Sequence, residues 1–408
     1  MRQVGRAGGS AIRRALVGLL VAVAIGIGVG GGALLATAGG PATGLAGRSS
    51  LPGPSANSSD VGPATAPPTA EPTSRPSPTP TPAPTPEPTP ILVAAPLTGL
   101  LVDPAGARRH PIAVMIDDHR DARPQSGFNA ASIVWHAPAE GGIPRYMLIF
   151  QDQVPGLVGP VRSSRQYYIE WASEWNAVYV HSGGSPQALA TLREKGHGQL
   201  VWNADEFRYG GRYLWRATDR RAPHNVYTNG EHLAQLAAVV GAKDGPIEPA
   251  WTFASRVSDD PRPAGTMLTV HYPDETITYR YDAASNTYPR FIDKASKPQV
   301  DAADGKVVAP SNVVILRMRF GALNDGHPDK KRLDADDVGT GEAIISTNGR
   351  TIVGTWSKAS ASAPTLLFDA AGKPARLTAG QTFVQVLALS YRYEIKAGIV
   401  ARDGVRFR

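Results

Sequence analysis

Residues 177–195, AVYVHSGGSPQALATLREK, place an apolar strand, a glycine-rich turn and a helix in immediate succession. Ser185 suits the N-cap of that helix because its hydroxyl accepts a backbone N–H, and Pro186 suits the first helical position. A second helix is expected at 231–240, ended by Gly241. Short apolar runs are expected to form strands at 112–116, 132–136, 146–150 and 177–180. This pattern predicts a mixed α/β domain over residues 97–248.

The sequence becomes β-rich after this region. Short strand-like runs are separated by turns that contain Gly, Asp and Asn. The expected strands cover 267–271, 276–281, 313–318, 342–346, 351–356 and 382–388. Residues 249–408 are therefore predicted to form a β-rich C-terminal domain, and the predicted fold class is α+β.

The N-terminus has the pattern of a membrane address. Four arginines among residues 1–14 precede an uncharged, apolar stretch at 15–38, which is long enough to cross a bilayer of about 30 Å as a helix. The positive-inside rule places residues 1–14 in the cytoplasm. The same stretch also fits a signal peptide cleaved near Ala38. Both interpretations export the rest of the chain, either anchored by a single membrane-spanning helix or secreted.

Residues 39–96 have the composition of a linker. They are rich in Pro, Thr, Ser, Ala and Gly, and every second residue from Pro76 to Pro90 is proline. Such a segment has no apolar face to bury, and its prolines donate no backbone N–H, so an extended and solvated chain is expected. It would serve either as a spacer of set length or as a disordered linker of no particular length.

Composition excludes several classes of function. The 408 residues include no cysteine, which removes disulfides, thiolate metal sites, cysteine nucleophiles and lipid-modified cysteine. The net charge is +7, but residues 1–96 hold six Arg and three acidic residues, so about +4 remains for the other 312 residues. This charge is too dilute for a nucleic-acid groove.

Several ordered motifs resemble the YerB-like bacterial envelope lipoproteins, a family of unknown function. The N-terminal half contains PIAVMIDDH (111–119), ARPQSG (122–127), EGGIPR (140–145), VGPVRS (158–163), HSGGSP (181–186) and APHN (222–225). The β-rich half contains YD (281–282), YPR (288–290), NVV (312–314) and GTWSK (354–358). The resemblance implies an extracytoplasmic, membrane-anchored protein with two family domains, and it supplies no reaction. Members usually carry a lipid-modified Cys, so anchoring here is expected to depend on 15–38.

Asp117 and His119 follow a predicted buried strand, where α/β sheets commonly place ligands. They would hold a metal or act as acid and base if partners such as His136, Glu140, His181 or His224 converge on them. Capping and hydrogen bonding at the strand end is the alternative role. No metal or other cofactor is predicted.

Two further motifs would suit an anion. Arg162 and Arg165 flank hydroxyl side chains, including Ser163, and would bind a carboxylate or phosphate, or else form a buried Arg–Asp pair that fixes a loop. The turn after the 177–180 strand would present free N–H groups at Gly183 and Gly184, or be purely structural. Its Ser185 is a poor nucleophile candidate because the spacing is not that of a nucleophile elbow.

Residues 208–221 interleave arginines and aromatic residues before His224 and Asn225. Such a surface would suit an anionic glycan or wall polymer, although a solvated face with packed aromatics is the alternative. The sequence thus favours a noncatalytic binding or assembly module for a cell-wall polymer or a membrane-protein partner. An envelope hydrolase or transferase is the alternative. Six residues are expected to line one concavity: Asp117, His119, Arg162, Arg165, His181 and His224.

Overall fold

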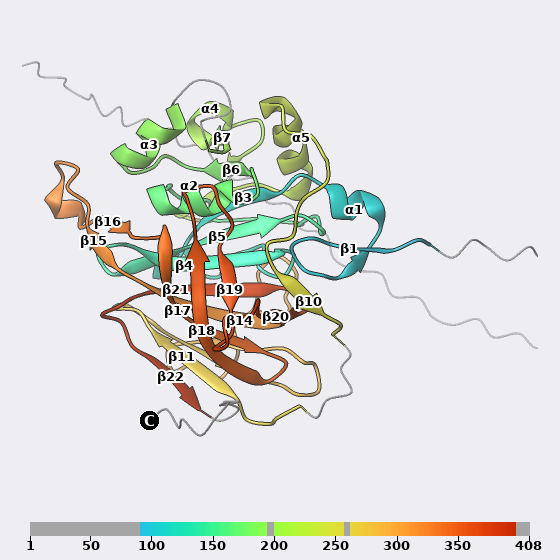
Figure 1. The fold of residues 1–408 in the computed structure, drawn as a ribbon. Coiled ribbons are helices and arrows are strands. Elements are labelled where there is room, and N and C mark those ends of the chain that lie inside the picture. Colours follow the sequence, from blue (N-terminus) through green and yellow to red (C-terminus); the bar gives the residue numbers. More distant parts are fainter. Residues whose placement is uncertain (1–89, 194–199, 257–261, 397–408) are drawn as a thin grey trace, which may run out of the picture. The chain divides into compact units, whose positions relative to one another are not determined.

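The computed structural model describes residues 90–193, 200–256 and 262–396 (Figure 1). The predicted anchor at 15–38 and nearly all of the predicted linker lie outside these ranges. Within them, no helix has both the length and the hydropathy needed to cross a membrane. The described residues all belong to one compact unit.

A ten-stranded sheet forms the centre of this unit, in the order β19-β18-β17-β14-β21-β4-β5-β3-β6-β7 (Figure 1). Its strands are β3 (Ile112–Asp117), β4 (Ile133–Glu140), β5 (Ile143–Phe150), β6 (Val178–His181), β7 (Trp202–Asp205), β14 (Asn312–Met318), β17 (Gly339–Thr347), β18 (Arg350–Lys358), β19 (Leu366–Phe368) and β21 (Thr382–Ala388). Every strand predicted from an apolar run is present, most of them with ends shifted by a few residues.

The sheet joins the two predicted domains. β21 pairs in parallel with β4, with Thr382 opposite Ile133 and Gln385 opposite His136. On its other side, β21 pairs in parallel with β14. All seven residues of β21 are buried, as expected for a central strand covered on both faces. The N-terminal and C-terminal halves therefore share one sheet and the core on each of its faces.

Alternate residues of β3 show how this core is divided. Val114 and Ile116 join one hydrophobic cluster, and Ala113 and Met115 join the other. Because side chains of a strand alternate between faces, β3 is buried on both sides. This placement carries Asp117, at the end of β3, to the edge of a rigid and fully packed strand.

The helices lie mainly in the N-terminal half. They are α1 (Pro104–Arg108), α2 (Gln166–Ser173), α3 (Pro186–Arg193), α4 (Glu206–Tyr209) and α5 (Gly230–Val240). The sequence predicted α5 and the start of α3. Asn229 caps α5 by accepting the His232 N–H, and Gly241 ends it with a φ of 93°. The sequence missed α2, which has no side-chain N-cap and buries aromatic residues that favour strands.

A four-stranded sheet, in the order β13-β12-β11-β22, covers part of the core. Its strands are β11 (Met267–His271), β12 (Thr276–Arg280), β13 (Arg290–Ile292) and β22 (Tyr393–Lys396). The turn between β11 and β12 reaches the N-terminal half, where the Tyr272 hydroxyl donates to the His136 carbonyl at 3.0 Å. This contact places Glu275 beside the end of β3.

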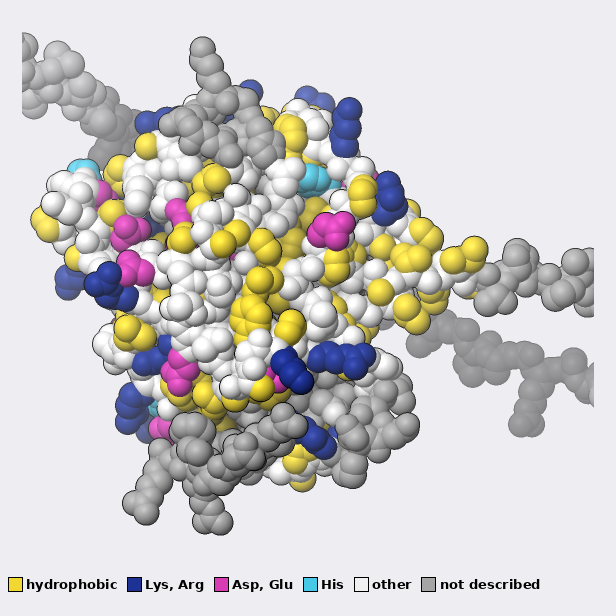
Figure 2. All heavy atoms as spheres, in the orientation of Figure 1, with side chains coloured by type: hydrophobic (Ala, Val, Ile, Leu, Met, Phe, Trp, Pro, Cys, Tyr) yellow, Lys and Arg dark blue, Asp and Glu magenta, His cyan; other side chains and the backbone are white. Residues whose placement is uncertain are grey.

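Short elements complete the fold. They are β1 (Val93–Ala94), β2 (Leu101–Val102), β8 (Trp215–Arg216), β9 (Val226–Tyr227), β10 (Thr252–Ala254), β15 (Phe320–Ala322), β16 (Leu333–Ala335), β20 (Arg376–Thr378) and the 3-10 turns Arg120–Ala122 and Pro328–Lys330. β1 pairs with β2, so ordered structure begins before the predicted start at residue 97. Hydrophobic side chains gather on the surface around this hairpin, where Ile91 is 79% exposed (Figure 2).

Candidate functional site

The candidate site lies at the carboxyl ends of three parallel strands. β3 pairs in parallel with β6, and β6 pairs in parallel with β7. The strands end at Asp117, His181 and Asp205, respectively. Ligands of α/β sheets commonly bind at this edge because the loops that follow the strands converge there.

Asp117 organises the site. Its Oδ2 accepts a 2.7 Å hydrogen bond from His224 Nδ1, and its Oδ1 accepts the backbone N–H of His119 at 3.0 Å. Arg162 Nε lies 3.0 Å from the same Oδ2, although the angle is not that of a hydrogen bond. Burial would raise the pKa of Asp117, but the charges of Arg145 and Arg162 and these hydrogen bonds outweigh burial and lower the pKa. Asp117 is therefore a carboxylate at neutral pH.

Two histidine rings stack beside this carboxylate. The centroids of His119 and His224 are 4.7 Å apart, and their planes differ by 16°. His119 Nδ1 accepts the backbone N–H of Asp121 at 3.2 Å. The His224 side chain is 13% exposed and that of His119 is 39% exposed. Both rings are therefore held from within the protein and open toward solvent.

Arg162 is a cation with unused donors. Its backbone pairs with the end of β3, since its N–H donates to the Met115 carbonyl at 2.9 Å. Its side chain is 25% exposed, and no residue in the described ranges bonds to its terminal nitrogens. Burial and the charges of Arg145 and Arg216 lower the pKa of Arg162, although Asp117 and Glu140 oppose them. An arginine remains protonated even so, and its planar donors suit a carboxylate or phosphate.

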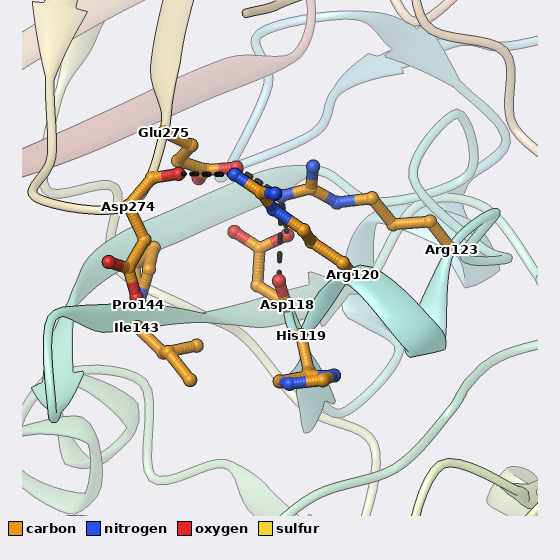
Figure 3. Close-up of a pocket in the computed structure, with 8 residues that line it drawn as sticks. All are labelled: Asp118, His119, Arg120, Arg123, Ile143, Pro144, Asp274 and Glu275. Atoms are coloured by element: carbon orange, nitrogen blue, oxygen red, sulfur yellow. Dashed lines mark hydrogen bonds and ion pairs between the residues drawn. The ribbon is translucent and has the colours of Figure 1, made fainter.

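Two pockets adjoin these residues. The first, of about 340 Å³, is lined by Asp118, His119, Arg120, Arg123, Ile143, Pro144, Asp274 and Glu275 (Figure 3). The second, of about 650 Å³, is lined by Asp121, Arg123, Asp219, Arg220, Arg221, Ala222 and His224. His119 thus faces the first pocket, His224 faces the second, and Arg123 belongs to both. The second pocket carries three arginines against two aspartates.

A cluster of titratable side chains adjoins the first pocket: Asp118, Arg123 and Glu275 line it, and His136 lies buried behind them. His136 Nε2 lies 2.8 Å from Asp118 Oδ2 and 3.4 Å from Glu275 Oε1. Arg123 pairs with both carboxyl groups, at 3.1 Å from Asp118 Oδ1. In Figure 3 the arginine reaches over both acids, while the His119 ring points away from them.

Protons in this cluster are strongly redistributed. Burial, with the charge of Arg290, lowers the pKa of His136 to about 3, although Glu275 opposes this change. Burial and the neighbouring Asp118 raise the pKa of Glu275 to about 8. At neutral pH His136 is therefore neutral and Glu275 is protonated. The sequence around Glu275 predicts only a turn between two strands. No motif therefore reveals that Glu275 joins Asp118 and His136.

Arg165 does not join Arg162 in a fork. Arg165 is 2% exposed and forms an ion pair with Glu140, which also pairs with Arg145 at 2.5 Å. The Ser163 hydroxyl accepts a 2.8 Å hydrogen bond from Arg145. The alternative for this motif is a buried Arg–Asp pair. Arg162 forms such a pair with Asp117 through Nε, whereas the partner of Arg165 is a glutamate, Glu140. Arg162 alone faces the site.

His181 and the turn after it are used inside the protein. His181 is fully buried, and its ring nitrogens lie 2.8 Å from the Gly183 carbonyl and 2.8 Å from Asn203 Oδ1. The Gly183 N–H donates to Asp205 at 3.1 Å, so a carboxylate already occupies that donor. Gly184 bridges to Ser164, and Ser185 caps α3 through the Ala188 N–H at 3.3 Å. The six residues therefore do not line one concavity. His119 lines the first pocket, His224 lines the second, and Asp117 and Arg162 lie behind them and line neither.

The 208–221 segment is partly internal. Arg208 and Arg212 lie over the rings of Tyr209 and Tyr213 at 5.2 Å and 5.1 Å. Asn225 accepts a 3.1 Å hydrogen bond from Arg216 and donates to the Ala217 carbonyl at 3.1 Å, which shapes the loop before His224. The second pocket receives only the end of this segment, from residue 219 onward.

Comparisons with known proteins agree with the resemblance seen in the sequence. The N-terminal domain model of the proteins of unknown function DUF3048 matches residues 97–243, and the C-terminal domain model matches 268–384. A relative from Bacillus subtilis (strain 168), described as "Putative lipoprotein YerB", is 33% identical over 271 residues, which are 65% of this chain and 78% of the relative. The crystal structure of YerB protein from Bacillus subtilis has a TM-score of 0.66 and 28% identity, covering 75% of this chain and 100% of that chain. This chain therefore belongs to the two-domain DUF3048 family of YerB-like proteins.

Proposed function

We propose that this protein is an extracytoplasmic binding module, tethered to the membrane, that holds an anionic group of a cell-wall polymer at Arg162. The observation that carries the proposal is the free guanidinium end of Arg162, held at the carboxyl edge of β3 and beside two solvent-facing histidines. A bidentate contact from such a fork is stronger and more directional than that of a lysine charge.

The second pocket, which Arg162 does not line, supports a polyanion as the ligand. Arg123, Arg220 and Arg221 line the second pocket, which adjoins His224. Arg220 is held in place by bonds of 3.0 Å and 2.9 Å to the carbonyls of Ala122 and Pro124. Arginines fixed in this way lose little further freedom on binding, so more of each contact contributes to affinity.

The address in the sequence supports an extracytoplasmic location. The 15–38 segment and the proline-rich 39–96 linker would place the folded unit at some distance from a membrane. The relative described as a lipoprotein agrees with attachment to the envelope. Wall polymers that carry phosphate or carboxylate groups are the anionic ligands available there, and a membrane-protein partner is the competing ligand.

Calorimetry with poly(glycerol phosphate) tests the proposal on the full chain in a nonionic detergent. Arg162→Lys should weaken binding roughly 10- to 100-fold, because charge-assisted hydrogen bonds contribute about 1.5–3 kcal/mol. Arg319→Lys is the matched control, since the Arg319 side chain is 76% exposed and its ion pair among the described residues is with Asp336 in the C-terminal half. Equal affinities for the wild type and Arg162→Lys, with intact folding, would remove Arg162 as the anion site.

A poly-glutamate arm separates phosphate from carboxylate as the recognised group. Binding of either polymer that depends on Arg162 supports the module. Absence of binding to both polymers would contradict the proposal. The hydrolase alternative is favoured by one specific contact, the 2.7 Å bond between Asp117 and His224.

A further inference from the structure

We infer that the second pocket recognises the hydroxyl groups of a polyol phosphate chain, with His224 Nε2 as the acceptor for a ligand hydroxyl. This inference rests on the proposed function, because it takes an anionic wall polymer as the ligand, and it names the chemical class of that polymer. It concerns the second pocket alone, which His224 lines and Arg162 does not.

Asp117 fixes which nitrogen of the His224 ring is an acceptor. In a neutral imidazole one nitrogen donates and the other accepts. Asp117 is a carboxylate and can only accept, so the proton of the neutral His224 ring lies on Nδ1, which donates to Oδ2 at 2.7 Å. Nε2 therefore carries the lone pair and accepts hydrogen bonds.

The Nε2 atom of His224 is open to the pocket. No residue in the described ranges bonds to it, and it is not one of the buried polar atoms without a partner, so solvent reaches it. The pocket has a volume of about 650 Å³, which is within the usual range of ligand sites. The ring is held by its bond to Asp117 and by its stacking on His119. An acceptor fixed in this way loses little further freedom when a hydroxyl binds.

The pocket also carries charges of both signs, from three arginines and two aspartates: Arg123, Arg220, Arg221, Asp121 and Asp219. Among the described residues, no ion pair joins one of these arginines to one of these aspartates. Arg220 is instead held by two peptide carbonyls, which leave its charge uncompensated. A ligand that brings both negative charge and hydrogen-bond donors matches this pocket, whereas a ligand with negative charge alone meets the aspartates without compensation.

A polyol phosphate chain has both features in every unit. Its phosphodiester carries a negative charge and accepts hydrogen bonds from guanidinium groups. Its free hydroxyl donates to the lone pair of His224 Nε2. A phosphodiester chain without hydroxyls would cover Nε2 with carbon and remove the hydrogen bond that water had supplied. The pocket should therefore prefer the chain that carries hydroxyls.

A metal ion is the competing occupant of this region. One ring nitrogen of His119, one of His224 and one carboxylate oxygen of Asp121 lie within 4.8 Å of one another, and a divalent cation accepts these ligand types. However, the two rings are stacked, with planes that differ by only 16°. Their lone pairs therefore lie in nearly parallel planes and do not converge on one ion. The three arginines of the pocket would also repel a cation.

Two oligomers that differ only in the hydroxyl measure this recognition directly. Oligo(glycerol phosphate) and oligo(propane-1,3-diol phosphate) can be made with the same length and charge, and only the first has a free hydroxyl on each unit. Calorimetry uses the full chain in a nonionic detergent at pH 8 with EDTA. The wild type should bind the glycerol oligomer roughly 2- to 10-fold more tightly, the range expected for one net hydrogen bond.

His224→Asn removes the acceptor and keeps the bond to Asp117. Asn carries its amide nitrogen on Cγ, as His carries Nδ1, so the amide still donates to Asp117 while no atom remains at the position of Nε2. This variant should bind the two oligomers equally, with the affinity that the wild type has for the propanediol oligomer. His327→Asn, at an exposed position in the C-terminal half, is the control and should keep the preference.

The outcomes separate this inference from the proposed function. Equal binding of the two oligomers by the wild type would overturn the inference and leave the binding module intact, and this comparison needs no variant to fold. A preference that survives in folded His224→Asn would overturn the assignment to Nε2. A preference that appears only when Zn²⁺ replaces EDTA would overturn it in favour of a metal site. Absence of binding to both oligomers would contradict the proposed function itself.

Discussion

The buried pair of His136 and Glu275 should give this protein a stability plateau in weak acid. His136 has a pKa of about 3 in the folded protein against an ordinary value of 6.5. Glu275 has a pKa of about 8 against an ordinary value of 4.5. Stability therefore changes with pH wherever the folded and unfolded chains hold different numbers of protons on these two groups.

The two shifts act in opposite directions. The raised pKa of Glu275 contributes stability that is complete below pH 4.5 and is lost as the pH rises to about 8. The lowered pKa of His136 contributes stability that is complete above pH 6.5 and is lost as the pH falls to about 3. Between 4.5 and 6.5 each state holds one proton on the pair, so the slopes cancel.

The size of the loss follows from the intervals outside this plateau. From 6.5 to 8 the folded pair keeps one proton that the unfolded pair has released. This interval of 1.5 pH units, at about 1.36 kcal/mol each, lowers the free energy of unfolding by about 2 kcal/mol. Between pH 4.5 and 3 the unfolded pair holds one proton more than the folded pair. A fall in pH over this interval therefore lowers the free energy of unfolding by a similar amount.

Urea unfolding of the full chain, followed by tryptophan fluorescence at several pH values, measures this dependence. Burial and Glu170 also raise the pKa of Asp337 to about 8. The loss of stability that comes from Asp337 must therefore be separated from the loss that comes from Glu275. Glu275→Gln keeps the shape and removes the titration. The wild type should lose about 2 kcal/mol more than this variant between pH 6.5 and 8. Parallel pH profiles of the two proteins would refute the reasoning.

Two substitutions test other parts of the fold by the same unfolding assay. Lys358→Met should destabilise the protein by about 3–5 kcal/mol, because it leaves the Glu174 carboxyl without its partner at 2.9 Å, and both side chains are fully buried. Adding Glu174→Leu should recover part of that loss. A double variant with a lower free energy of unfolding than Lys358→Met would contradict the argument. Asn229→Ala should cost about 1 kcal/mol by removing the cap on the His232 N–H, with Asn229→Asp as the tolerated control. An unchanged midpoint for Asn229→Ala would show that the cap contributes nothing.

Part of the site was predictable because it is local. Asp117 ends an apolar run, and the apolar run that forms β3 is visible in the sequence. The placement of His119 two residues later follows from the same strand. His224, which pairs with Asp117, is 107 residues away in the sequence. The pair forms only because the loop after residue 217 lies against the end of β3, and no local sequence pattern predicts this position.

The two arginines of the 162–165 motif show the limit of motif reasoning. Sequence spacing suggested a shared anion, but Glu140, at the end of β4, takes Arg165 and Arg145. Arg162 instead lies against Asp117, with its Nε 3.0 Å from Oδ2. Which arginine keeps unpaired nitrogens depends on where the carboxylates of neighbouring strands lie. The order of the strands in the sheet sets those positions.

The sequence by itself determined the α+β class, the positions of ten of the twenty-two described strands, and the C-terminal end of α5 at Gly241. These features depend on residues close together in the chain, through side-chain periodicity, capping and composition. Only the tertiary structure decided that β21 lies between β14 and β4, that Glu275 reaches Asp118, and that the rings of His119 and His224 stack. Those outcomes depend on contacts between distant segments, whose partners are selected by the packing of the whole sheet and not by local propensity.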